Sequence, residues 1–369
     1  TFDTDNLTLG RNGSNIGGGA DDSVISTEGI AVTLVYVDGT KGWIVTDSGL
    51  ATDAPGPLYI AASGGCITTC GNFKMHTFLS PNTFTVSCGG NAIGSTTVDY
   101  MVIAGGGSGG TTNGAQGAGG GGGGAGGYRE SSGAASGCYT VSPLGSGVTA
   151  VTVGVQSYTV TVGGGGTTET FPQPGSSFSN PGSDSSFDTI TSSGGGGGTN
   201  YATLSPGGSG GGYGNDNAVD TPTGGVGNIP VVSPAQGTNG GGSTATPTFY
   251  GAGGGGGAIT AGSKGTACIA GGGGPGATSS ITGSPVQRAG GGGGGTYGGG
   301  PGTGGPAEAA GGGGGGGTGS SYPKGDNSTA GGINTGGGGG GTGSNPTGAS
   351  NYSGKAGGSG IVIIRYRYQ

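Results

Sequence analysis

Few side chains in this sequence could carry out chemistry. Its 369 residues include 17 Asp and Glu, five Cys and a single His, His76. Residues 106–110 (Gly-Gly-Ser-Gly-Gly) formally match the turn that presents a nucleophilic serine, and a catalytic triad would need His76 as its base. His76 lies in the alternating segment 73–79, which is typical of a strand, so we expect a strand or core role for it. The carboxylates are dispersed, without a pair for glycosidase chemistry, and the sequence therefore predicts no enzymatic activity.

Metal and phosphate sites are not indicated either. Cys66 and Cys70 have the spacing Cys-x-x-x-Cys, but His76 is the only His that could complete a zinc site. Residues 211–219 resemble one calcium-binding β-roll nonapeptide, which would place calcium at Asp216, but such sites need tandem copies. Matches to Gly-x-Gly-x-x-Gly arise by chance at this glycine content and lack a βαβ context. We expect no metal and no cofactor.

The cysteines leave two alternatives open. If the protein matures outside the cell, a Cys66–Cys70 or a Cys70–Cys88 disulfide is compatible with the sequence. The odd number of cysteines then leaves at least one free or intermolecular thiol. The alternative is burial as small apolar residues. The five residues are Cys66, Cys70, Cys88, Cys138 and Cys268.

Glycine dominates the composition, with 109 Gly and 18 Pro. The glycines occur in blocks rather than at every third position, which excludes collagen. No apolar run approaches the roughly 18–20 residues of a membrane span, so we expect no membrane insertion. The net charge is −7 and the ten Lys and Arg are scattered, so nucleic-acid binding is not expected. So few charges also argue against a charge-expanded disordered chain.

Strong apolar residues concentrate in the N-terminal part, and only residues 1–103 can build a conventional, small core. Residues 1–49 are expected to form a small β-module. Its main feature is a hairpin of residues 30–38 and 41–46 with a turn at Asp38-Gly39. Residues 50–65 are rich in turn residues and are interpreted as a linker.

The rest of the chain is also β in character, with two regions of different composition. Residues 66–104 contain the strands that lead into the Gly-rich domain, and residues 105–369 form that domain. One or two strands are expected at 148–162, and the strongest strand signal is 361–368. No segment has helical periodicity, so we predict an all-β fold with almost no α-helix. The strands expected in the first region are 73–79, 83–88 and 98–104.

The polyglycine runs could be flexible linkers or a packed structure, because ordering glycine has a large entropy cost. Two strands, 98–104 and 361–368, bracket the Gly-rich domain, and we expect them to pair as a clasp, with 148–162 in the same sheet. Runs of four to seven Gly fit about two turns of an extended helix with three residues per turn. We therefore favour a polyglycine II helix bundle over disorder, with residues 291–294 and 312–316 inside it. Runs of at least four Gly begin at residues 119, 163, 194, 253, 271, 290, 311 and 336.

Two parts of the chain resemble proteins of tailed phages. Residues 6–16 and 32–43 resemble a β-module of tail-fibre-type virion proteins of marine phages, over about residues 1–46. Residues 66–107 and 359–366 resemble the bracketing strands of phage glycine-rich domains, which also occur in adhesins at the tips of long tail fibres. The resemblance implies a bundle of polyglycine helices with host-contacting loops at its end. It also implies a strand before Thr1, so that the chain begins within the module.

We therefore expect a non-enzymatic, extracellular virion protein: a tail fibre or fibre-tip adhesin. Its expected partners are other tail or fibre proteins and a host receptor, either a glycan or an outer-membrane protein, and a homo-oligomer is compatible with the sequence. One alternative is a structural subunit of a self-assembling extracellular or virion-surface filament, and a weaker one is a carbohydrate-degrading tailspike. Aromatic and amide residues between the glycine runs are the candidates for receptor binding. They are Tyr201, Tyr213, Asn215, Phe249, Tyr250, Tyr297, Tyr322 and Tyr352.

Overall fold

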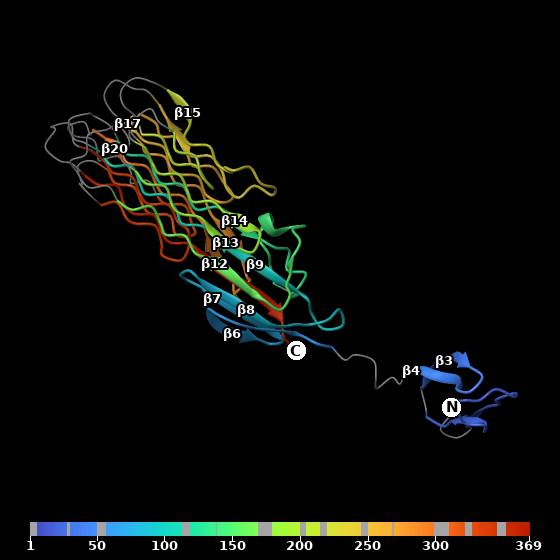
Figure 1. The fold of residues 1–369 in the computed structure, drawn as a ribbon. Coiled ribbons are helices and arrows are strands. Elements are labelled where there is room, and N and C mark those ends of the chain that lie inside the picture. Colours follow the sequence, from blue (N-terminus) through green and yellow to red (C-terminus); the bar gives the residue numbers. More distant parts are fainter. Residues whose placement is uncertain are drawn as a thin grey trace. The chain divides into compact units, whose positions relative to one another are not determined.

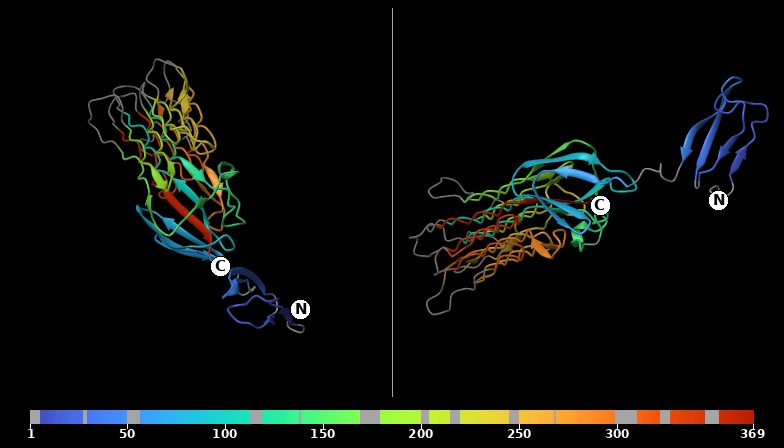
Figure 2. Two further views of the ribbon diagram at one scale, coloured as in Figure 1. Left: turned by 45° about the vertical axis from the view of Figure 1, so that its right-hand side comes forward. Right: turned by 90° about the horizontal axis from the view of Figure 1, so that it is seen from below.

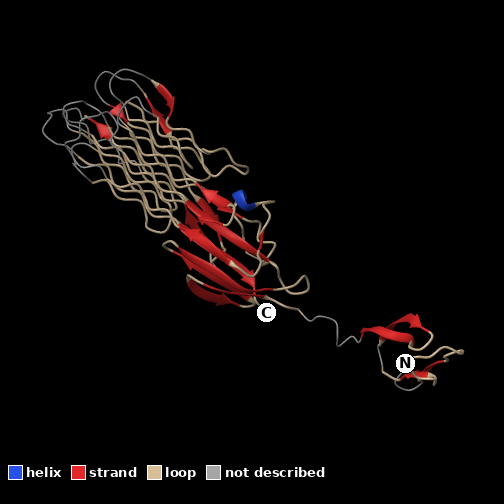
Figure 3. Cartoon of the chain, in the orientation of Figure 1, coloured by secondary structure: helices blue, strands red, loops and turns tan. Residues whose placement is uncertain are grey.

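Strands make up nearly all of the regular structure in a computed structural model of the chain (Figure 3), as predicted. The only helical element among the described residues is a 3-10 turn, η1 (Pro143–Gly145). The chain divides into two compact units, Thr1–Leu58 and Tyr59–Gln369. The structure describes residues 6–27, 30–49, 57–112, 119–137, 139–168, 179–199, 204–214, 220–244, 250–267, 269–298, 310–321, 327–344 and 352–369.

The first unit contains two antiparallel strand pairs. β1 (Leu7–Leu9) pairs with β2 (Ser23–Ile25), and β3 (Ala31–Asp38) pairs with β4 (Gly42–Gly49), which confirms the predicted hairpin. The Asp38 carboxylate accepts hydrogen bonds from the backbone N–H groups of residues 40 and 41, which stabilises the turn and lowers the pKa of Asp38. None of this unit's described hydrophobic side chains is buried. The expectation of a core in residues 1–103 therefore fails for this unit.

A six-stranded sheet in the second unit contains the predicted clasp (Figure 1). β9 (Thr97–Ile103) pairs antiparallel with β21 (Ile361–Arg367), with Ile361 opposite Ile103. The sheet order is β10–β9–β21–β7–β6, and β11 also pairs with β9. The bounds of the remaining strands are β6 (Cys66–Cys70), β7 (Phe73–Phe78), β10 (Tyr128–Glu130) and β11 (Val151–Thr152).

A second sheet packs on the first, and its order is β14–β13–β12–β8–β5. β7 and β8 are consecutive in the chain but belong to different sheets. The segment 148–162 is likewise divided, because β11 joins the clasp sheet and β12 the second sheet. Part of the expected linker forms β5, which pairs with β8. The bounds are β5 (Ile60–Ser63), β8 (Asn82–Gly89), β12 (Ser157–Thr161), β13 (Ser185–Phe187) and β14 (Ile190–Ser192).

The clasp strands are buried on both faces, which explains their continuous apolar sequence. One face packs with the second sheet around Phe84, Phe187 and Tyr366. The other face packs against residues that lie between the two clasp strands in the chain, including Tyr128 and Ile281. The main core therefore combines residues from both sides of the composition boundary, because β21 and β12 come from the Gly-rich part.

Three short strand pairs complete the regular structure of the described residues. β15 (Thr221–Thr223) pairs with β16 (Gly241–Ser243), and β17 (Tyr250–Gly251) pairs with β20 (Thr296–Tyr297). A hairpin of β18 (Ala277–Ser279) and β19 (Val286–Arg288) lies beside the clasp sheet. Figure 1 shows glycine-rich segments running side by side from the sheets to the end marked by β15, β17 and β20, and Figure 2 shows the same arrangement from two other directions.

Backbone hydrogen bonds link these glycine-rich segments with a period of three residues. In segment 120–127, every third N–H donates to the same neighbouring segment; Gly120, Gly123 and Gly126, for example, all donate to 336–342. An extended helix with three residues per turn and no internal hydrogen bonds directs its N–H groups in this way. The other segments that accept hydrogen bonds from the N–H groups of 120–127 are 193–199 and 253–256. The segments that donate to the carbonyl groups of 120–127 are 104–110, 209–212 and 292–295. We call the array of glycine-rich segments between β9 and β21 the glycine bundle.

Segment 120–127 is surrounded by these six neighbouring segments, which leave no room for side chains. A Cβ atom added at Gly121, Gly122 or Gly123 would lie well under 3.0 Å from a carbonyl of another segment, closer than real Cβ atoms come. Close approach therefore explains why these positions are glycine. Residues 291 and 292 are buried in the same way, as predicted.

One prediction about the bundle was wrong in part. The run that begins at residue 311 does not continue straight through residues 312–316, because residues 313–315 form a turn. Gly314 and Gly315 have φ values of +99° and +93°, in the region that favours glycine. This glycine run therefore contains a chain reversal, which its uniform sequence does not indicate.

Candidate functional site

Ser and Thr side chains terminate the glycine bundle at the end away from the sheets. After several of the glycine runs that lead away from the sheets, the next residues are buried Ser or Thr residues. The Thr112 and Thr342 hydroxyls are 3.0 Å apart, and Thr342 donates to the carbonyl of Gly110. A short hydroxyl side chain can bond to backbone groups, so it suits the last layer of a packed backbone array. The buried residues of this hydroxyl layer are Thr111, Thr112, Thr199, Ser243, Thr296, Ser320, Thr342 and Ser344.

Backbone pairings tie several segments together at this end. Tyr250 lies opposite Tyr297, and Tyr297 also forms a bridge with Ser344. A second bridge joins Thr112 and Tyr352. The described residues Thr112, Tyr250, Tyr297, Ser344 and Tyr352, each at or next to the border of a described range, therefore lie together at this end of the bundle.

The predicted receptor-binding residues are only partly placed. The backbones of Tyr250, Tyr297 and Tyr352 lie at the hydroxyl end, and the side chains of Tyr297 and Tyr352 are half-buried. A receptor-binding role would need Tyr213 to be exposed, but only 4% of it is, so this prediction is wrong for Tyr213. The other four predicted residues, Tyr201, Asn215, Phe249 and Tyr322, lie outside the described residues.

The burial of Tyr213 has a clear cause. Tyr213 continues the glycine segment that precedes it: its N–H donates to the carbonyl of Gly241, and its carbonyl accepts from the N–H of Gly253. It is therefore a member of the bundle rather than of a surface loop. Sequence reasoning also missed the hydroxyl layer, for which the signal is a Thr or Ser that directly follows a glycine run, as in Gly295-Thr296 and Gly341-Thr342.

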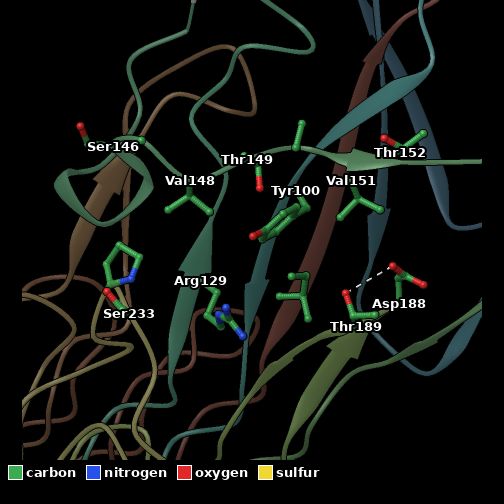
Figure 4. Close-up of a pocket in the computed structure, with 14 residues that line it drawn as sticks. Tyr100, Arg129, Ser146, Val148, Thr149, Val151, Thr152, Asp188, Thr189 and Ser233 are labelled. Carbon is green, nitrogen blue, oxygen red and sulfur yellow. Dashed lines mark hydrogen bonds between the residues drawn. The ribbon is translucent and has the colours of Figure 1, made fainter.

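A separate cavity of about 680 Å³ lies beside the sheets (Figure 4). Tyr100 and Arg129 line it together with Asp188, whose carboxylate accepts a hydrogen bond of 3.4 Å from the Thr189 hydroxyl. Burial raises the pKa of Tyr100, and the nearby charge of Arg129 partly opposes this shift. The described lining combines one guanidinium, one carboxylate and hydroxyls, and it has no paired acid and base.

His76 has the core role expected from its strand. It is fully buried, with its ring stacked on Tyr366 and edge-on to Phe84. Its Nδ1 donates to the carbonyl of Gly64 over 2.7 Å, and its Nε2 accepts from the Tyr366 hydroxyl over 3.1 Å. Burial raises the pKa of Tyr366 to about 12, so this hydroxyl remains a donor. Burial lowers the pKa of His76, despite the opposing effect of the hydrogen bond to Gly64.

Two buried carboxylates also have structural partners. Asp99 accepts hydrogen bonds from Ser131, from the N–H of Gly133, and from both the N–H and the hydroxyl of Ser136. These bonds attach the loop after β10 to the clasp. Glu130 similarly accepts from Tyr128, Ser142 and Ser279. No group of three His, Cys, Asp or Glu residues could hold a metal within the described part of the chain, and Asp216 lies outside that part.

The cysteine expectations need correction. Cys66, Cys70 and Cys88 are free thiols, and Cys66 and Cys70 are exposed rather than buried. Cys66 and Cys70 lie four residues apart on one strand, a separation of about 13 Å. A disulfide needs Cα atoms about 4.4–6.8 Å apart, so the two cannot bond within one chain. Cys138 and Cys268 lie outside the described residues.

Comparison with known proteins identifies the larger unit. No curated protein matches the chain. None of the helices in the described ranges is long and apolar enough to cross a bilayer. The family model described as a glycine-rich domain matches residues 79–367, which begin before the clasp strand β9 and end at the last residue of β21. The chain therefore belongs to this glycine-rich domain family.

Proposed function

We propose that this chain is a non-enzymatic virion protein of the tail-fibre or fibre-tip adhesin type. In this proposal the glycine bundle is a rigid stem, and the segments at its hydroxyl end bind a surface glycan or outer-membrane protein of the host. The proposal includes an extracellular location on the virion and attachment to other tail or fibre proteins.

One observation carries the proposal: the bundle collects the borders of several segments at one end. Thr112, Tyr250, Tyr297, Ser344 and Tyr352 are joined there by backbone pairing. A rigid scaffold that presents several connecting segments on one surface is a common design for binding proteins. Tyr250, Tyr297 and Tyr352 border these segments, and the segments themselves contain several Asn and Gly residues; together these residue types supply large contact area and adaptable hydrogen bonds at low entropic cost.

The physical properties of the bundle also suit a stem. Interior glycine positions have no side-chain entropy to lose, and consecutive backbone N–H groups bond to different neighbouring segments, so that many weak hydrogen bonds act together. The few described charges at the hydroxyl end include an ion pair of Asp220 and Lys264, which is partly exposed and contributes little stability. Recognition at this end would therefore depend mainly on aromatic and hydrogen-bonding groups.

Segment exchange tests this function. Segments 113–118, 200–203, 215–219, 245–249, 299–309, 322–326 and 345–351 are replaced with Gly-Ser sequences of equal length, and the labelled full chain is tested for adsorption to a panel of bacterial isolates. Loss of the contacts should cost about 2 kcal/mol or more, roughly thirtyfold in affinity. The control replaces Val231 and Ile333, whose side chains are 79% and 78% exposed in turns at the sheet end, with Ser.

Three outcomes would contradict the proposal. Adsorption that is unchanged by the exchange, with folding preserved, would place binding elsewhere. Filaments of the purified chain in electron micrographs, without adsorption to any isolate, would favour the structural-filament alternative. Sugar release from host envelopes would instead indicate a depolymerase.

A further inference from the structure

The outer edge of β6 is an unprotected sheet edge. β6 is the last strand of the clasp sheet, and no described residue pairs with its outer side. All five residues, Cys66 to Cys70, are exposed. Natural proteins usually protect such edges with Lys, Pro or a bulge, because free N–H and C=O groups recruit another strand. The sequence of β6, Cys-Ile-Thr-Thr-Cys, contains no charge and no Pro.

The hairpin determines which backbone groups this edge offers. β6 and β7 are joined by a two-residue turn, and Cys70 and Phe73 form the closing pair. In such a turn the closing residues are hydrogen-bonded to each other, so the backbone groups of Cys70 point toward β7. Because this direction alternates along a strand, Thr68 and Cys66 also point toward β7. The N–H and C=O groups of Ile67 and Thr69 therefore face the open edge.

This pattern is complementary to itself. If a second copy of β6 pairs antiparallel about Thr68, Ile67 of each copy exchanges backbone hydrogen bonds with Thr69 of the other. Cys66 then lies opposite Cys70 of the second copy, at a non-hydrogen-bonded position. Residues at such positions have Cα atoms about 4.5 Å apart, and their side chains are close together. That separation lies within the range a disulfide needs, about 4.4–6.8 Å.

We propose that two copies of this chain pair edge to edge through β6 and are joined by two disulfides, each between Cys66 of one copy and Cys70 of the other. Each bond forms from two thiols, which lose two protons and two electrons to a disulfide oxidant such as oxidised glutathione; the oxidant leaves as two thiols. The pairing is two-fold and uses both free edges, so it closes as a dimer and does not extend into a filament.

A complementation experiment tests both the partner and the register. The full chain is prepared with Cys88, Cys138 and Cys268 replaced by Ser, incubated with oxidised glutathione, and analysed on non-reducing gels. This parent protein should form a band at twice the 33.8 kDa of the chain. Cys66→Ser alone or Cys70→Ser alone should give no covalent dimer, because each remaining thiol faces a serine. An equal mixture of the two variants should restore the covalent dimer.

Two further variants separate pairing from folding. Thr69→Pro removes an outward N–H without breaking a hydrogen bond to β7, so it should leave the monomer folded and abolish the dimer. In a Cys66→Ser/Cys70→Ser background, Thr68→Cys should cross-link two copies, since Thr68 lies opposite itself. Ile67→Cys in the same background is the matched control and should not cross-link, because it faces Thr69.

Each outcome decides the question. Covalent dimers from either single variant, or none from the mixture, would overturn the register. A parent protein that stays monomeric under oxidation, while its unfolding transition remains intact, would overturn the dimer itself.

Discussion

Adding a methyl group to two neighbouring glycines should change stability in opposite directions. Gly164 and Gly165 are adjacent in one glycine run, and neither has a positive φ. A Cβ at Gly164 would meet no atom within 4 Å. A Cβ at Gly165 would overlap the carbonyl of Gly357 and lie 2.9 Å from the carbonyl carbon of Gly358. The two Ala variants therefore differ only in what the new methyl group contacts.

The magnitudes follow from two effects. Replacing Gly by Ala restricts the unfolded chain and stabilises the folded state by about 0.4–1 kcal/mol where the site is open. Gly164→Ala should show this gain. Gly165→Ala should show the same gain, but its methyl group also overpacks a backbone contact, which should destabilise the folded state by about 1–3 kcal/mol. The difference between the variants isolates this second effect, so their free energies of unfolding should differ by about 1–3 kcal/mol.

Denaturant unfolding of the full chain measures this difference. Of the 14 Tyr residues, all but Tyr36 lie in the unit Tyr59–Gln369, so tyrosine near-UV circular dichroism reports mainly on that unit. The single Trp, Trp43, lies in the other unit, and its fluorescence should be unchanged in both variants. If Gly165→Ala stabilises the protein as much as Gly164→Ala, the glycine run behaves as a coil and the bundle packing is refuted. Gly292→Ala extends the test to the interior, with the same expected loss.

Three other perturbations test the clasp and the core. Truncation after Gly360 removes six buried side chains of β21. The five hydrophobic ones are worth about 1.5–3 kcal/mol each, which together approaches the whole stability of a domain, so thermal unfolding that stays unchanged would disprove the clasp. The pKa of His76 is lowered below 6.5 by burial, so at mildly acidic pH the unfolded state binds more protons than the folded state. Stability should therefore fall as the pH drops through 6.5, and His76→Gln should flatten this dependence in urea titrations. Asp99→Ala leaves four buried donors without their carboxylate. Each unsatisfied donor costs about 1–3 kcal/mol, so a loss of about 4 kcal/mol or more is expected, with hydrogen exchange first increased in residues 131–137.

Side-chain patterns predicted the β-sheet part of this protein well. The β-branched residues of β21 and β9 indicated buried strands, and their position on both sides of the glycine region indicated that they pair. The Asp38-Gly39 turn indicated the β3–β4 hairpin. A strand or core role for His76 followed from the alternation of its segment. Each of these predictions rested on the type of side chain, because burial and turn formation depend on side-chain type.

The candidate site was predicted less well. The composition of the inter-run segments pointed to binding residues, but it could not show that Tyr213 is enclosed by the backbones of neighbouring segments. Nor did the sequence show that the thiols of Cys66 and Cys70 lie on an open sheet edge, since that depends on the order of strands in the sheet.

The sequence by itself determined that this chain is all-β, and it favoured a packed glycine array closed by the strands β9 and β21 over a disordered one. Only the tertiary structure decided which glycine segments are neighbours, where a run reverses, and which connecting residues meet at the hydroxyl end. The physical reason is that glycine runs are nearly identical to one another. Without side chains, any run could bond to any other, so the clasp and the connecting turns select one arrangement among many that are locally equivalent.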